Sequence, residues 1–217
     1  GWSFGEVSAT SNRVMSPNGS LNADKLVESN TNARHELYGN VLAYNGTTSI
    51  SFFAKAAERR YICVFVGGDP AVGGATFDVK DGIVSLTSGG TNASIIKYSN
   101  GWYKCQFTTT KVANTQVYYC LRDNGNAVNI QTYQGDGISG MYLWGFQTEI
   151  GQSYPTSYIK TVGTTQTRVA DTANLNLTSF TLTSITETIG GVEQSPITVI
   201  PSTYTIPFGK INKIIMI

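Results

Sequence analysis

The chain has 217 residues, a formal net charge of +1 at pH 7 and only 13% charged residues, about half the usual share in globular proteins. Its 15 Lys and Arg residues barely exceed its 14 Asp and Glu residues, which excludes nucleic-acid binding through bulk electrostatics, because no basic excess exists to neutralise a phosphate backbone. The length suits one all-β domain with an appendage, and the 85 Thr, Ser, Asn and Gly residues favour strands and turns over helices.

Several other classes of protein are excluded by residues that the sequence lacks. His35 is the only histidine, so a histidine-rich zinc site cannot form. No run of about 18 apolar residues is present, so we expect no transmembrane helix and no membrane insertion. Cys63, Cys105 and Cys120 lie in apolar runs, and their odd number and wide spacing predict three buried thiols rather than a disulfide framework.

Short strand candidates separated by turn signals recur along most of the chain. Strands are indicated by alternating or continuous apolar, β-branched and aromatic residues between Gly, Asn or Asp residues. The pairs Asp81-Gly82 and Asn100-Gly101 predict tight hairpin turns, and residues 55–60 are interpreted as a connection between strands. No long segment has a 3.6-residue period of apolar residues, so the regular alternation of short strands and turns predicts an all-β sandwich. The expected strands are 48–55, 61–66, 76–79, 83–86, 94–98, 102–108, 116–122, 128–133 and 141–146.

Alternation within the expected strands separates an apolar face from a face of mixed aromatic and polar side chains. Val117, Tyr119 and Leu121 share one face of their strand, and Tyr118 and Arg122 share the other. The mixed face suits a sugar, because an aromatic ring stacks on apolar C–H groups while polar groups bond the hydroxyls. An inert exposed face is the alternative, since Tyr is a good strand residue. The candidate glycan-binding residues are His35, which we expect to be exposed, Tyr38, Tyr118, Arg122, Gln131 and Tyr133.

The composition of the sequence changes near Asp171. Residues 172–188 are nearly free of charge and alternate Leu, Phe and Ile with polar residues, and residues 211–217 form a hydrophobic, β-prone end. We therefore expect a domain of residues 1–171 followed by a short β segment of residues 172–217. An exposed, unpaired hydrophobic strand is an aggregation hazard, so residues 211–217 should pair inside their own chain or against another subunit.

The sequence contains few candidate catalytic groups. Most carboxylates lie next to Gly or Asn, where Asp serves as a turn former, and no segment presents the facing pair of carboxylates that a glycosidase needs. We therefore expect no catalytic residues, no enzyme activity and no cofactor. Asp69, Asp136 and Asp171 could help to hold a structural calcium ion, because hard cations take carboxylate and carbonyl oxygens from loops.

Four blocks of sequence in a fixed order carry a resemblance to a known family. The blocks are SPNGSLNADKLVE at Ser16–Glu28, a strand block at Ser49–Val64, a block with GWYKCQFT at Ala75–Thr108, and YQGDGISGMYLWGFQTEIGQSYPTSYIKT with its continuation at Tyr133–Asp171. Together they resemble the carbohydrate-binding-module-like jelly-roll domains of tailed-phage and prophage virion proteins, such as tail fibres, tailspikes and head fibres. The blocks are spread in order along residues 16 to 171.

The resemblance implies a jelly-roll fold and a structural role on the virion surface. It implies a fibre, tail or capsid-surface protein that attaches to host or environmental glycans, with other virion subunits as partners and a homo-oligomer, favoured as a trimer. The residues that carry the resemblance are mainly scaffold residues, so the resemblance implies the fold more directly than it implies the ligand.

Two other functions are compatible with the sequence. The chain could be a ligand-free decoration or adaptor module whose sheets contact other capsid or tail subunits, which the low charge and the hydrophobic end favour. It could also be the binding module of a secreted bacterial glycan hydrolase whose catalytic domain lies outside this segment.

Overall fold

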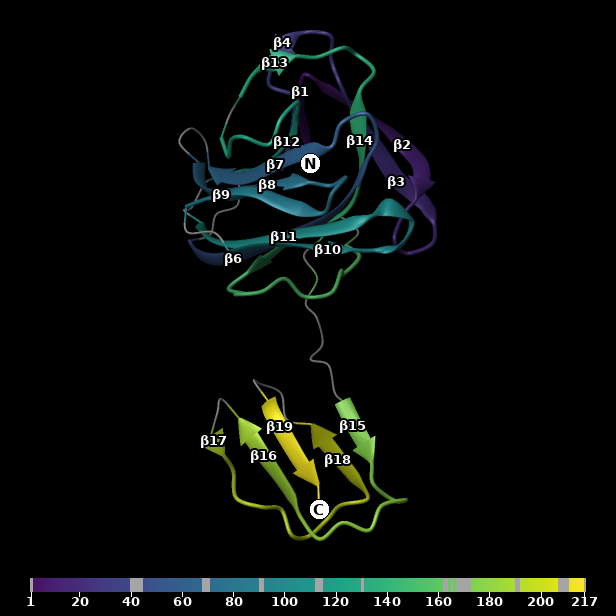
Figure 1. Cartoon of the computed structure of the whole chain (residues 1–217), viewed down its shortest axis with the longest axis vertical. Coiled ribbons are helices and arrows are strands. Elements are labelled where there is room, and N and C mark those ends of the chain that lie inside the picture. The colour runs from purple at the N-terminus through teal and green to yellow at the C-terminus, as the bar shows by residue number, and fades with distance from the viewer. Residues whose placement is uncertain are drawn as a thin grey trace. The chain divides into compact units, whose positions relative to one another are not determined.

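The computed structural model describes residues 2–39, 45–67, 71–89, 92–111, 115–129, 131–161, 164, 166, 173–189, 192–206 and 211–216. The chain divides into two compact units, Gly1–Lys160 and Thr161–Ile217, and each is described here by itself (Figure 1). The boundary predicted after Asp171 lies outside the described residues. In the described part of the chain, no helix has the length and apolar character needed to cross a membrane.

The first unit is a β-sandwich, as predicted. Two antiparallel sheets pack against each other, and the chain passes between them repeatedly, in the manner of a jelly roll (Figure 1). Sheet A has the order β1 (Ser3–Gly5), β5 (Glu36–Tyr38), β12 (Val117–Arg122), β7 (Tyr61–Gly67), β8 (Ala71–Asp78) and β9 (Ile83–Ser88). Sheet B has the order β10 (Asn92–Lys97), β11 (Tyr103–Lys111), β6 (Gly46–Ala56), β14 (Gly140–Ile150), β3 (Leu21–Glu28) and β2 (Val7–Met15).

One apolar core fills the space between the two sheets. Phe52 of β6 makes edge-on contacts with Phe77 of β8 and Tyr119 of β12, at ring-centroid distances of 5.9 and 5.3 Å. Val117 and Leu121 are buried in the same core, so the predicted alternation of β12 is confirmed. Each such buried side chain stabilises the fold by roughly 1.5–3 kcal/mol relative to an exposed one.

The two predicted hairpin turns are present, and both depend on residues that tolerate a positive φ. Gly82 has φ +71° in the turn between β8 and β9. Asn100 and Gly101 have φ values of +57° and +77° in the short 3₁₀ turn η1 (Ser99–Gly101), which joins β10 to β11. Residues 57–60 connect β6 to β7 as expected. All three cysteines are buried free thiols, also as predicted.

The strand predicted over residues 128–133 is wrong. Of its described residues, only Tyr133 is in a strand, β13 (Tyr133–Gln134), which pairs with the two-residue strand β4 (Asn32–Ala33). Val128 instead packs against Cys63 and Phe65 on the outer surface of sheet A. Its side chain meets the sheet from outside, so it does not continue a strand.

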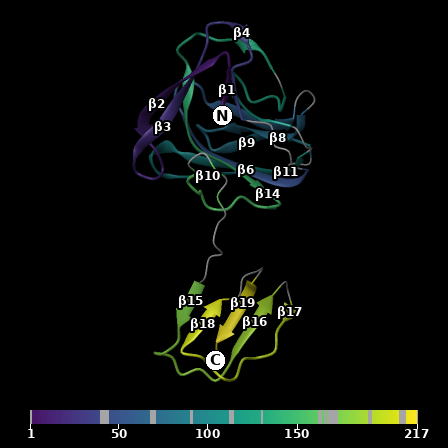
Figure 2. The ribbon, with the colours of Figure 1, turned by 180° about the vertical axis from the view of Figure 1, so that it is seen from behind.

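The second unit has a small core of its own. Leu177, Ile185 and Tyr204 are buried there, with Met216 partly buried against them. The hydrophobic end of the chain pairs with a strand of its own chain, since β19 (Ile211–Met216) lies antiparallel beside β16 (Ile185–Ile189) (Figure 2). The strands of this unit are β15 (Ala173–Asn176), β16 (Ile185–Ile189), β17 (Val192–Glu193), β18 (Thr203–Ile206) and β19 (Ile211–Met216).

Candidate ligand-binding face

The outer surface of sheet A carries the mixed aromatic and polar face predicted from β12. Because neighbouring side chains of a strand point to opposite faces, Tyr118, Cys120 and Arg122 lie on the surface opposite to the core residues of β12. Strand pairing extends this surface in rows across β5, β12 and β7. One row is Tyr38, Tyr118 and Phe65, and the next is Glu36, Cys120 and Cys63.

A connecting segment, residues 123–129, covers the middle of this face. The Thr76 hydroxyl donates a hydrogen bond of 2.5 Å to the carbonyl oxygen of Ala127. Arg122 donates from its guanidinium to the carbonyl oxygen of Asn129, and Val128 packs over the two cysteines. The face is therefore covered at its centre, and the end formed by the aromatic row lies beyond the covering segment.

The covering segment corrects part of the predicted glycan face. Arg122 is only 2% exposed, and its side chain is used to hold the segment. Tyr133 is also buried, because its hydroxyl donates to the Glu28 carboxylate at 2.7 Å. Gln131 is half-buried just before β13 and lies outside the aromatic row.

The prediction that His35 is exposed is wrong. Its side chain is 1% exposed, and its ring contacts the Tyr133 ring at a centroid distance of 4.5 Å. Its Nδ1 atom lies 2.8 Å from the carbonyl oxygen of Glu6, and its Nε2 atom lies 3.3 Å from that of Tyr133. The polar sequence around His35 suggested exposure, but inside the fold the imidazole finds backbone carbonyl oxygens that can accept from its N–H.

His35 and Tyr133 belong to a buried polar network that joins the two ends of the first unit's sequence. Glu28 lies at its centre, with a fully buried carboxylate that accepts two hydrogen bonds from Arg59 at 2.6 and 2.7 Å. Desolvation acts to raise the pKa of Glu28, but the hydrogen bonds from Arg59, Tyr133 and the Asp136 backbone outweigh it and hold the pKa below its usual value. The groups are paired with one another, so this network serves the scaffold.

Two predicted residues, Tyr38 and Tyr118, meet at the open end of the face. Their ring centroids are 5.4 Å apart at an interplanar angle of 32°. Phe65 stacks on Tyr118 at 5.1 Å with an angle of 13°, so three strands contribute one aromatic row. Both tyrosines are half-buried, which leaves part of each ring accessible, and the Tyr118 hydroxyl donates to Gln116 at 2.8 Å.

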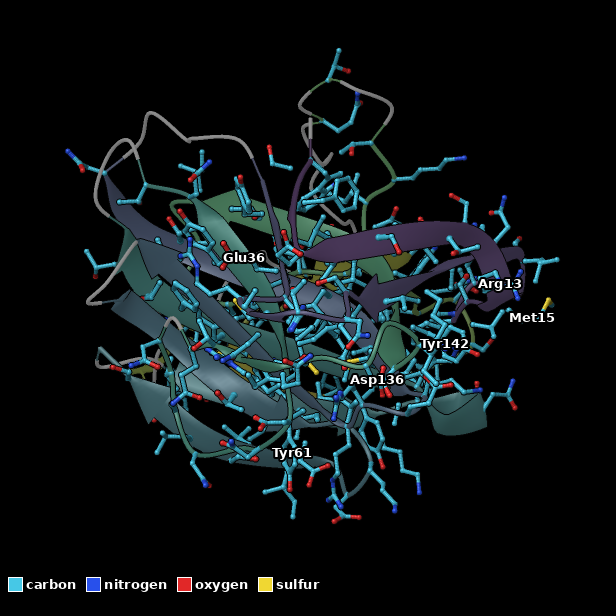
Figure 3. All side chains as sticks on the ribbon, turned by 90° about the horizontal axis from the view of Figure 1, so that it is seen from above. Arg13, Met15, Glu36, Tyr61, Asp136 and Tyr142 are labelled. Carbon is cyan, nitrogen blue, oxygen red and sulfur yellow. The ribbon has the colours of Figure 1, made fainter. Side chains whose placement is uncertain are left out.

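Charged groups lie in the row next to these rings. Glu36 is 4% exposed, and desolvation raises its pKa although Arg34 acts in the opposite direction. Arg34 lies 3.7 Å from the Glu36 carboxylate and keeps much of its own side chain exposed. Glu36 also accepts a weak hydrogen bond from the Cys120 thiol at 3.8 Å. The end of the face thus offers the stacking surface of the two tyrosines beside the exposed Arg34, and the Glu36 carboxylate, labelled in Figure 3, is buried next to them.

Sequence reasoning named the two tyrosines of this end but missed Glu36 and Phe65. The alternation in His35-Glu36-Leu37-Tyr38 could have placed Glu36 on the face of Tyr38, because Leu37 between them belongs to the core. Phe65 lies in a run of apolar residues, YICVFV, in which alternation is invisible and the outward-facing residue cannot be identified.

The residues suggested for a calcium ion are only partly described. Asp69 and Asp171 lie outside the described residues. The Asp136 carboxylate accepts hydrogen bonds from the Ser139 backbone and hydroxyl at 2.6 and 2.5 Å, and these bonds lower its pKa. In the part of the chain that the structure describes, no three His, Cys, Asp or Glu side chains form a group that could hold a metal ion.

Comparison with known proteins adds no relative. No family model matches the chain, and no curated protein matches it.

Proposed function

We propose that the chain is a glycan-binding structural protein of a tailed-phage virion, on a fibre, tail or capsid surface. The ordered sequence blocks that resemble virion jelly-roll domains support the virion role. The observation that carries glycan binding is the accessible pair of Tyr38 and Tyr118 beside the exposed guanidinium of Arg34. Rings of this kind stack on the apolar face of a sugar, and the Arg34 guanidinium donates to its hydroxyls. The buried ring of Phe65 supports Tyr118 from below.

The mode of attachment follows from the shape of this end. It is a surface rather than a deep pocket, so each site buries little of a sugar and binds it weakly. Several copies on one particle raise the overall affinity without any new contact. Binding without bond making is sufficient for attachment, and the proposal assigns no catalytic residue.

The test is binding of the purified chain to an array of bacterial surface glycans, followed by titration of the best ligand. Tyr38→Ala is expected to weaken binding at least tenfold, because it removes one accessible ring of the row. Tyr118→Phe keeps the stacking ring and should bind within about threefold of the wild type. Tyr154→Ala is the matched control, since Tyr154 is 66% exposed and lies outside sheet A. Equal binding by the Tyr38 variant and the Tyr154 variant would disprove the assignment of this face.

Assembly through the second unit is a second candidate role. Among its described residues, Leu177, Ile185 and Tyr204 form a small core, and Phe180 and Val199 are 63% and 86% exposed. Small units of this kind are often stabilised by association. Light scattering of the whole chain at several concentrations tests this role. A stable oligomer that Val199→Glu weakens would support it, and a monomer at every concentration would contradict it.

A further inference from the structure

An apolar pocket lies between the two sheets of the first unit, away from the aromatic row. It opens where the edge strand of sheet A, β1, and the edge strand of sheet B, β2, follow one another along the chain. Its volume is about 80 Å³. The side chains that define its chemistry are Trp2, Phe4, Asp24, Leu26, Leu143 and Phe146.

Three aromatic rings and one carboxylate give this pocket a specific chemical character. Trp2 contacts Phe146 at a ring-centroid distance of 4.9 Å, and Trp2 and Phe4 remain 45% and 50% exposed. Asp24 accepts one hydrogen bond, from the backbone N–H of Asn12 to its Oδ1 atom at 3.0 Å. None of the described residues that line the pocket is basic, so the negative charge of Asp24 is not balanced within the lining.

The wall formed by β1 is held in place from both ends. Glu6, which follows β1, has a φ of +51°, and its carboxylate accepts hydrogen bonds from the hydroxyls of Ser29 and Thr31 at 2.8 and 3.0 Å. At the other end, Trp2 makes an edge-on contact with the buried ring of Tyr119 at 5.8 Å. The aromatic wall is therefore preformed, which reduces the entropy that a ligand must lose on binding.

Solvent access and polarity together select the ligand class. The pocket is open to solvent beside Trp2 and Phe4, so a ligand rests one end of itself against the aromatic wall and is not enclosed. A single carboxylate cannot satisfy the several hydroxyls of a sugar, but it can balance one positive charge. Aromatic rings attract cations through their negative faces, and methylated ammonium groups are bound in this way. We propose that the pocket binds a methylated ammonium head group, with its methyl groups against Trp2, Phe4 and Phe146 and its charge balanced by Asp24.

The test is a calorimetric titration of the whole chain with choline chloride, with sodium chloride added to keep the ionic strength constant. The matched ligand is 3,3-dimethylbutan-1-ol, which has the same shape as choline but no charge. We expect saturable binding of choline in the millimolar range and at least tenfold weaker binding of the alcohol. Choline should also change the fluorescence of the wild type, and Trp2→Phe should abolish that change.

Two variants separate the charge of the pocket from its shape. Asp24→Asn keeps the oxygen that accepts from Asn12 and should weaken choline binding at least tenfold while leaving binding of the alcohol unchanged. Asp81→Asn removes an exposed carboxylate outside the pocket and should bind choline as the wild type does. Equal affinities for choline and the alcohol, or no effect of the Asp24 substitution, would overturn the proposal. Because Tyr38 lies outside the pocket, Tyr38→Ala should leave choline binding intact, and the outcome is independent of glycan binding.

Discussion

At the scale of single residues, two buried carboxylates of the first unit have pKa values that are shifted in opposite directions. Glu28 accepts hydrogen bonds from Arg59, Tyr133 and the backbone of Asp136, which lower its pKa. Glu36 has an ion pair with Arg34 and a weak bond from a thiol, and desolvation raises its pKa. Burial of a carboxylate therefore does not by itself determine its charge, because the number and strength of its donors decide the outcome.

Replacement of Glu28 should be among the most damaging single substitutions in the chain. Glu28→Gln leaves the Arg59 guanidinium without its charged partner and should lower the free energy of unfolding by about 3 kcal/mol. Urea denaturation at pH 7 measures the change. Asp81→Asn is the control, because it breaks only the exposed pair of Asp81 with Arg60 and should cost less than about 1 kcal/mol. Equal losses in the two variants would show that the Glu28 network does not stabilise the fold.

The pH dependence of stability should reveal that the pKa of Glu36 is shifted in the opposite direction to that of Glu28. Its pKa is higher in the folded state than in the unfolded chain, so its contribution to stability is fully present below the unfolded pKa and is lost as the pH rises through the folded pKa. Glu36→Gln removes this loss. The variant should therefore gain stability relative to the wild type between pH 4 and pH 7, as measured by urea denaturation at both values.

Glu28→Gln is the internal control for this measurement. Glu28 has a lowered pKa, so its contribution is present above the unfolded pKa and is lost as the pH falls through the folded pKa. Glu28→Gln should therefore lose stability relative to the wild type over the same rise in pH. If both variants changed in the same direction, the assignment of opposite pKa shifts would be wrong.

At the scale of elements, β14 depends on a close approach to its neighbour β3. A Cβ atom on Gly140 would lie 2.1 Å from the carbonyl oxygen of Leu26, which is too close for the two strands to keep their pairing. Gly140→Ala should therefore lower the free energy of unfolding by about 3 kcal/mol. Gly19→Ala is the control, because Gly19 has a φ of +82° but no atom near its Cβ position, and the strain should cost about 1 kcal/mol. Similar values from chemical denaturation of both variants would refute the steric argument.

The elements also show which parts of the fold were predictable from sequence. Turns such as Asp81-Gly82 were predicted because the residue types that adopt a positive φ are few. The early strands β2 and β3 were not predicted, since the exposed residues of β2 give no apolar alternation. Residues 128–133 gave a strand-like pattern because Val128 is apolar, but its apolar contacts are with the outer surface of sheet A. An apolar residue in a local sequence pattern indicates that its side chain is buried, but it does not indicate which element buries it.

The candidate site was less predictable than the fold, for a related reason. Alternation correctly put Tyr118 and Arg122 on one face, yet only Tyr118 is accessible, because the segment of residues 123–129 covers Arg122. The pocket between β1 and β2 depends on Trp2 and Asp24, which are distant in sequence and meet only when the sandwich forms. Exposure and proximity of this kind are properties of the packed chain, and no periodicity within one strand reports them.

At the scale of the whole molecule, the two units have separate hydrophobic cores of unequal size. The core of the first unit contains many large buried side chains, including Phe52, whereas Ile185 is one of three buried apolar residues among those of the second unit whose burial is described. Since the apolar surface removed from water is the main source of stability, the second unit should unfold at the lower temperature. Scanning calorimetry of the whole chain is expected to show two transitions rather than one.

Core substitutions assign the two transitions. Ile185→Ala leaves a cavity beside Leu177 and Tyr204 and should lower only the first transition, whereas Phe52→Ala should lower only the second, each change corresponding to roughly 2–5 kcal/mol of the unit concerned. Glycan binding at Tyr38 should persist between the two transitions, because that face belongs entirely to the first unit. A single transition that both substitutions shift would mean that the units unfold together, which would contradict independent unfolding of the two cores.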